Sequence, residues 1–142
     1  MTQKSAKPEK MSWLIPYLIV SDAGATAHFY QHNFGFEILS TAKDDAGKIF
    51  HAELRYKDIV IMCGNAGVDG DTAKPPLQGH FVSPVTLYFY HDDVDALYDF
   101  LQNNNVGVDA PPTNEFWGDR VINLKDLDGH RLCFATHVAD HP

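Results

Sequence analysis

Two patterns of hydrophobic residues follow one another along the chain, one typical of strands and one typical of helices. The same order of patterns occurs twice. The runs IPYLIV and PVTLYFY are rich in β-branched and aromatic residues, which is typical of buried strands. After each run, apolar residues recur every three or four positions, which predicts a helix with one inward face. The inward residues are Ala23, Ala27 and Tyr30 or Phe34 in the first helix, and Val94, Leu97 and Leu101 in the second.

Each predicted helix begins at a short polar residue and ends near a glycine. Side-chain oxygens of such residues accept hydrogen bonds from the free N–H groups of the first turn. The candidate caps are Ser21 or Asp22 for the first helix and Asp92 or Asp93 for the second. Gly35 and Gly107 are expected to close the two helices.

Three short extended segments follow each helix. In the first half they are FEILSTA, KIFHAELRY and DIVIMCG, and in the second half they are GVDAP, DRVINLK and HRLCFATH. The order strand, helix, three strands therefore occurs twice, and we expect each helix to pack on one face of a sheet.

The two halves match when the sequence is shifted against itself by half its length, which places Asp22 on Asp93 and Gly47 on Gly118. An offset of half the chain indicates duplication of one supersecondary unit. The predicted organisation is a loosely held or disordered tail at 1–11 and one domain at 12–137, with module one at 12–64, a linker rich in Gly, Pro and Asp at 65–84, and module two at 85–137.

Five segments together resemble a known family. They are PYLIVSDAGATAHFYQHNFGFE, HAELRYKDIVIM, VTLYFYHDDVDALYDFL, NEFWGDRV and DLDGHRLCFATH. In this order they resemble the vicinal oxygen chelate superfamily of glyoxalase I, extradiol dioxygenases and bleomycin-resistance proteins, and within it the PhnB-like branch. The resemblance implies an α+β fold in which two βαβββ modules form a cupped mixed β-sheet around a ligand site, commonly as a homodimer.

Metal-dependent members of this superfamily carry His, Glu or Gln on the first and fourth strands of each module. The resemblance places these positions at Ile15, Met62, Thr86 and Cys133. A catalytic divalent metal usually needs three or more nitrogen, oxygen or thiolate ligands, which these four side chains do not supply. No cofactor is therefore predicted, and a divalent metal touching His51 and Glu53, which share a strand face, is the alternative.

Aromatic residues are the remaining candidates for a ligand site. Tyr17 and Tyr88 occupy matching positions in the two halves, and each lies two residues beyond one of the metal-ligand positions, hence on the same strand face. Their rings suit flat or cationic ligands, although core tyrosines with bonded hydroxyls explain the pattern equally well.

The segment NEFWGDR adds two further candidates. Trp117 can cover a ligand, and the planar fork of Arg120 can bind a carboxylate or phosphate. The alternative has Trp117 packing on the sheet or at a dimer contact, with Asp119 and Arg120 forming a surface ion pair. On the third strand of module one, Glu53 is the candidate catalytic acid or base, and His51 is a candidate ligand-binding residue.

Charge and composition limit the classes of molecule that the protein is expected to bind. The net charge is −8, and because the first ten residues carry three lysines against one glutamate, the rest carries −10. An acidic body without clustered Lys or Arg argues against nucleic acid and membranes as partners and favours encounter with cations.

Two cysteines far apart suit a reduced compartment. The lysines and apolar run before Ala23 resemble a secretion signal, but Pro16 interrupts the run, so a strand and a cytoplasmic location are expected.

Two functions from different classes follow. The first is a metal-free protein that binds a small aromatic or cationic molecule in its cup. The second is a lyase, isomerase or dioxygenase of the same superfamily that uses a metal or Glu53. The chain has no GxSxG, P-loop or GxGxxG motif, so nucleophilic hydrolysis and nucleotide chemistry have no support.

Overall fold

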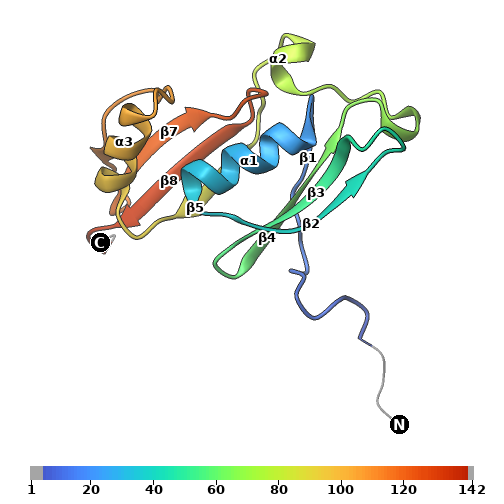
Figure 1. Cartoon of the computed structure of the whole chain (residues 1–142). Helices are drawn as coiled ribbons and strands as arrows, with labels where there is room; N and C mark the ends of the chain where they lie inside the picture. Colours follow the sequence, from blue (N-terminus) through green and yellow to red (C-terminus); the bar gives the residue numbers. More distant parts are fainter. Residues whose placement is uncertain (1–4, 141–142) are drawn as a thin grey trace. The chain divides into compact units, whose positions relative to one another are not determined.

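The structure is a computed structural model that describes residues 5–140, and the chain divides into two compact units, 1–74 and 75–142. The division falls inside the predicted linker at 65–84. In the described part of the chain, each unit contains one four-stranded mixed sheet (Figure 1).

The first unit follows the order strand, helix, three strands. Its elements are β1 (Tyr17–Val20), α1 (Ala23–Phe34), β2 (Glu37–Lys43), β3 (Ile49–Tyr56), β4 (Ile59–Asn65) and the short 3₁₀ helix η1 (Val68–Gly70). The sheet order is β1-β4-β3-β2, with β1 parallel to β4 and the other pairs antiparallel. The helix α1 packs on one face of this sheet.

The second unit repeats this plan after a short helix. Its elements are α2 (Pro76–Gly79), β5 (Thr86–Tyr90), α3 (Val94–Asn103), β6 (Thr113–Asn114), β7 (Asp119–Lys125) and β8 (Arg131–His137). The order β5-β8-β7-β6, with β5 parallel to β8, is the same topology. The predicted fold of two βαβββ modules is therefore confirmed.

The predicted match between the two halves also holds in strand register. Tyr17 of β1 pairs with Met62 of β4, and Tyr88 of β5 pairs with Cys133 of β8. The matching glycines Gly47 and Gly118 both have positive φ, at 83° and 95°. The repeat therefore extends to backbone conformation.

Both helices begin at the predicted second candidate. Oδ1 of Asp22 accepts from the N–H of Ala25, and Oδ1 of Asp93 accepts from the N–H of Ala96, each at 3.1 Å. Gly35 closes α1 with φ at 77°, as predicted.

The prediction for Gly107 is wrong, because α3 ends at Asn103 and the left-handed residue after it is Asn105, with φ at 58°. Asparagine is one of the few residues with a side chain that adopts this conformation readily.

The predicted strand GVDAP is also absent from the second sheet, whose edge strand is only Thr113–Asn114. The N–H of Asp109 still donates to the carbonyl of Asn123 at 2.8 Å. Pro111 and Pro112 follow, and since proline has no N–H the ladder resumes only after them.

The predicted inward residues of both helices are buried, each with 5% or less of its surface exposed. Cys63 and Cys133 are buried free thiols, as expected. Residues 1–4 of the predicted tail lie outside the described residues, while the carbonyl of Lys10 accepts a hydrogen bond from Arg55 at 2.7 Å. No described helix is long and apolar enough to cross a membrane.

Candidate functional site

The second sheet has one face against α3 and an opposite face, which we call the open face. Side chains alternate along each strand, so residues two apart share a face. The open face carries Tyr88 and Tyr90 of β5, Asp119 and Val121 of β7, and Cys133, Ala135 and His137 of β8. Phe89, between the two tyrosines, is buried and stacks on Phe134 of the α3 side.

Asp119 is the centre of a hydrogen-bond network on the open face. It is only 1% exposed, and its Oδ2 accepts from the hydroxyls of Tyr88 at 2.5 Å and Tyr90 at 2.9 Å. Its Oδ1 lies 3.0 Å from Nδ1 of His137, the register partner of Asp119 on β8. A buried carboxylate is stable when its oxygens are bonded in this way.

The network shifts the pKa of each member in the direction that its hydrogen bonds require. The bond from Tyr88 lowers the pKa of Asp119, although burial acts in the opposite direction. Burial and the bond to Asp119 raise the pKa of Tyr88, and the bond to Asp119 raises that of Tyr90. The carboxylate therefore stays ionised and both hydroxyls keep their protons at neutral pH.

A hydrogen bond from Trp117 also helps to hold the ring of Tyr88 in place. Its Nε1 donates to the hydroxyl oxygen of Tyr88 at 3.0 Å, so that oxygen both donates and accepts. The adjacent Phe116 contacts the Trp117 ring edge-on at 4.9 Å and is 79% exposed. This hydrogen bond joins Trp117 to one tyrosine of the predicted pair.

His137 links the network to the end of the chain. Its Nε2 lies 2.9 Å from Oδ1 of Asp140, which together with Asp119 raises the pKa of His137. The N–H groups of Val138 and Ala139 both donate to the carbonyl of Gly118, at 2.8 and 3.1 Å. The segment after β8 is therefore held against the residue that precedes Asp119.

The first unit brings three sequence candidates together. The hydroxyl of Tyr17 lies 3.1 Å from Nδ1 of His51, and Nε2 of His51 lies 3.8 Å from Oε1 of Glu53. The side chains of His51 and Glu53 are each 23% exposed. Tyr17 reaches His51 across Gly64, where a Cβ atom would collide with the tyrosine hydroxyl.

A hollow of about 410 Å³ adjoins Tyr17 and is also lined by Asn65, Asp69 and Asp71. Burial raises the pKa of Tyr17, and the two aspartates raise it further. The hollow is acidic.

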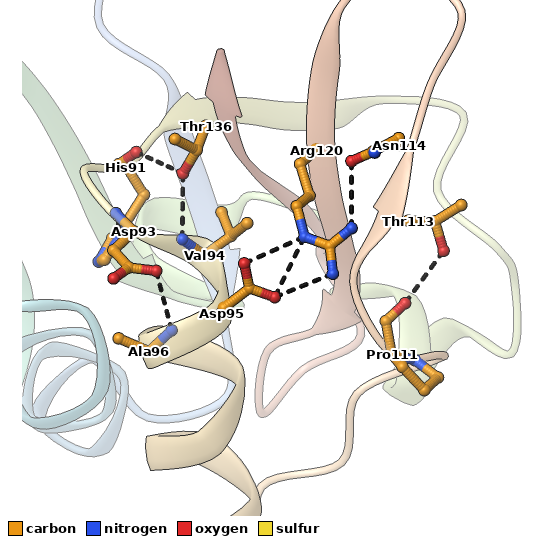
Figure 2. A network of polar contacts seen from close by, with 10 residues as sticks. All are labelled: His91, Asp93, Val94, Asp95, Ala96, Pro111, Thr113, Asn114, Arg120 and Thr136. Carbon is orange, nitrogen blue, oxygen red and sulfur yellow. Dashed lines mark hydrogen bonds and ion pairs between the residues drawn. The ribbon is translucent and has the colours of Figure 1, made fainter. Parts of the chain in front are cut away.

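Arg120 lies apart from the other candidates. It points to the α3 side of β7, where Nε and Nη2 donate to Asp95 at 3.0–3.1 Å and Nη1 donates to Asn114 at 3.1 Å (Figure 2). The alternative prediction of an ion pair between Asp119 and Arg120 is wrong, because neighbouring strand residues point to opposite faces.

The positions that the family resemblance assigns to metal ligands do not fit a divalent metal in this chain. Ile15, Met62 and Thr86 offer no imidazole or carboxylate. Burial raises the pKa of the Cys133 thiol to about 11, so this side chain remains protonated at neutral pH. Within the described residues, no three His, Cys, Asp or Glu side chains are grouped so that they could hold a metal ion.

Sequence reasoning missed Asp119, Tyr90 and His137 as members of one cluster. The alternation of Tyr88 and Tyr90 indicated a shared face, but Asp119 lies 29 residues from Tyr90 in sequence. Only the pairing of β5, β7 and β8 brings these side chains together.

Comparison with known proteins places the chain in a family. The profile of the Glyoxalase/Bleomycin resistance protein/Dioxygenase superfamily matches residues 11–134. The uncharacterized protein Mb0911c of Mycobacterium bovis is 31% identical over 135 residues, which cover 89% of this chain and 84% of the relative.

Two solved structures share the fold. TioX from Micromonospora sp. ML1 has a TM-score of 0.71 at 23% identity and covers 89% of this chain and 99% of its own. TnmS3, an antibiotic binding protein from Streptomyces sp. CB03234, has a TM-score of 0.64 at 24% identity and covers 87% of this chain and 93% of its own. The chain belongs to the glyoxalase/bleomycin resistance protein/dioxygenase superfamily.

Proposed function

We propose that this protein binds a small aromatic or cationic molecule on the open face of its second sheet and that it does so without a catalytic metal. The observation that carries the proposal is the pair of tyrosines on that face. Tyr88 and Tyr90 are 43% and 55% exposed although their hydroxyls bond to a buried carboxylate. Aromatic rings that are fixed in place and left exposed are typical of a ligand surface.

The surroundings of the tyrosines support this proposal. The hydrogen bond from Trp117 holds Tyr88 in place, and Phe116 adds exposed aromatic surface beside Trp117. TnmS3, which has the same fold, is an antibiotic binding protein, so the fold is used for small-molecule binding elsewhere. Fold similarity alone does not transfer a ligand, and the proposal therefore rests on the residues of this chain.

The side chains at Ile15, Met62, Thr86 and Cys133 support the metal-free part of the proposal. We expect untagged protein, prepared with added Zn, Ni, Mn and Fe salts, to contain no stoichiometric metal by elemental analysis. We also expect native mass spectrometry to find a homodimer. One metal ion per chain that disappears in Glu53→Ala would overturn the metal-free proposal.

The binding proposal is tested by thermal shift and ligand-observed NMR with small neutral aromatic and organic-cation probes. We expect saturable binding that Tyr88→Leu abolishes. Phe100→Leu, which removes an exposed aromatic ring from α3, is the matched control and should bind the probes normally. Equal binding by wild type and Tyr88→Leu would overturn the proposed site.

A second candidate function rests on the group formed by Tyr17, His51 and Glu53. A partly buried carboxylate beside an imidazole can transfer a proton, so a lyase or isomerase that uses Glu53 remains the alternative. This alternative expects turnover that Glu53→Gln removes while the binding of probes to the second sheet is unchanged.

A further inference from the structure

We propose that the ligand of the open face is a small alkylammonium cation, seated in the corner between the rings of Tyr88 and Tyr90. The inference rests on the proposed function, because it names the ligand class of that same surface. Buried Asp119 then acts as a positioning residue that orients both rings and supplies the negative field behind them.

The corner is defined by ring geometry. The centroids of Tyr88 and Tyr90 are 5.7 Å apart and their planes meet at 70°. Both hydroxyls are directed to the same oxygen of Asp119. The tyrosines therefore offer ring surface to a ligand, while their polar ends are engaged within the sheet.

The hydrogen bonds to Asp119 make these rings better partners for a cation. A phenol that donates to a carboxylate takes on part of the electron density of a phenolate, since hydrogen-bonded groups polarise one another. A cation over an aromatic face is attracted by that density. The N–H of Trp117 withdraws some density from Tyr88, but the same bond holds the ring in place.

The charge of Asp119 reaches the corner through low-dielectric surroundings. This residue is only 1% exposed, so solvent and salt screen its charge less than that of a surface carboxylate. Because Asp119 is covered by the tyrosines, we expect the cation to contact the rings and to sense the carboxylate from behind them.

The charged groups around the network are mainly acidic. The carboxylates that act on the titratable groups of the open face are Asp119, Glu115 and Asp140. Arg120 is engaged by Asp95 on the opposite face, and Arg131 donates to the carbonyl of Ser83 at the far end of β8. His137, which lies between two carboxylates, is the one titratable base bonded to the described network. This distribution favours a cation over an anion.

The first unit provides an internal comparison. Tyr17, the counterpart of Tyr88, bonds to an imidazole instead of a carboxylate. The field of a buried carboxylate is therefore absent from its hydroxyl, although Asp69 and Asp71 line the hollow nearby. A cation site beside Tyr17 in the first unit is therefore a separate possibility, and the experiment below distinguishes it from a site beside Tyr88.

The test uses two probes of nearly the same shape, choline and its uncharged isostere 3,3-dimethylbutan-1-ol, with quinoline as a neutral aromatic probe. The chain has two tryptophans, so the background variant Trp13→Phe leaves Trp117 as the only one. Emission of Trp117 reports the site directly, and ligand-observed NMR gives a second readout that does not depend on tryptophan.

We expect choline to bind saturably and about tenfold more tightly than the neutral isostere, as a cation–aromatic contact requires. Asp119→Asn and Tyr88→Phe should each weaken choline binding about three- to tenfold and leave binding of the isostere unchanged, because both keep the rings and reduce their electron density. Tyr90→Phe also keeps its ring and removes the other hydrogen bond from a tyrosine to Asp119. It provides a second test in case Asp119→Asn does not fold. Phe100→Leu should bind choline like the background variant.

Each other outcome overturns the inference in a distinguishable way. Equal affinity for choline and the isostere, or binding of quinoline alone, would show that the ligand is not selected for positive charge. Either result would be consistent with the proposed function. Loss of choline binding in Tyr17→Leu with retention in Tyr88→Leu moves the site to the first unit. Binding of none of the probes overturns both the inference and the proposed function.

Discussion

The hydroxyl of Tyr88 donates a hydrogen bond to Oδ2 of Asp119 over 2.5 Å, although the two residues are 31 positions apart in sequence. In the first unit the corresponding Tyr17 makes an equivalent cross-strand contact with His51. In both units a tyrosine of the first strand thus reaches across the neighbouring strand, but its partner is an imidazole in the first unit and a carboxylate in the second.

The bond between Tyr88 and Asp119 should contribute measurably to stability. We expect Tyr88→Phe and Asp119→Asn each to lower the free energy of unfolding by about 1–3 kcal/mol, since the first removes one donor to the buried carboxylate and the second replaces a bond to an ionised group with a weaker neutral one. The double variant should lose less than the sum, because both changes weaken the same contact. Urea denaturation of the four proteins measures this coupling, and strict additivity would show that the bond is not formed.

Gly118 should be intolerant of a side chain. Its φ of 95° disfavours other residues, and a Cβ atom would collide with the carbonyl of Ala139. We expect Gly118→Ala to lower the free energy of unfolding by about 2 kcal/mol or more. Gly107→Ala is the control, because nothing lies within 4 Å of its Cβ position and its φ is not positive, and it should change stability by less than about 0.5 kcal/mol. Similar melting temperatures for the two variants would contradict the close contact.

The pair of His137 and Asp119 predicts a pH dependence of stability. Because the pKa of His137 is raised by Asp140 and Asp119, its contribution is fully present below the unfolded value of about 6.5 and is lost as pH rises through the folded pKa. Because the pKa of Asp119 is lowered, its contribution is present above about pH 4 and is lost as pH falls through the folded pKa.

The melting temperature of wild type should therefore exceed that of His137→Gln most clearly near pH 6, and the difference should shrink toward pH 9. Differential scanning fluorimetry across this range measures the trend. His28→Gln, on the exposed surface of α1, is the control. A difference that grows with pH would contradict the assigned ion pair.

Arg120 should affect stability without affecting the open face. Its forked contact with Asp95 joins β7 to α3 (Figure 2), and the two side chains are 31% and 57% exposed. We expect Arg120→Ala to lower the free energy of unfolding by about 1 kcal/mol or less, as is usual for an exposed ion pair. Asp95→Ala should have a similar effect, and choline binding should be unchanged in both. Loss of binding in Arg120→Ala alone would return this residue to the ligand site.

The sequence by itself determined most of the fold. The stripe of Val94, Leu97 and Leu101 identified the face of α3 that packs on the sheet, because the helical period is local. Asp22 and Asp93 identified the helix starts for the same reason, since a cap acts within one turn. The end of α3 was missed because Asn105 takes the left-handed position in place of a glycine.

The candidate site was predictable only in part. The match between the two halves placed Tyr17 and Tyr88 on corresponding strands, but alternation alone did not reveal what their hydroxyls reach. Tertiary structure decided that Asp119 and Arg120, adjacent in sequence, have opposite roles, because neighbouring residues of a strand face opposite sides of the sheet. It also decided the partners of Asp119, since they come from β5 and β8, which meet β7 only after the sheet forms. Local periodicity fixes elements and their faces, whereas a site built across strands depends on long-range pairing that no single segment encodes.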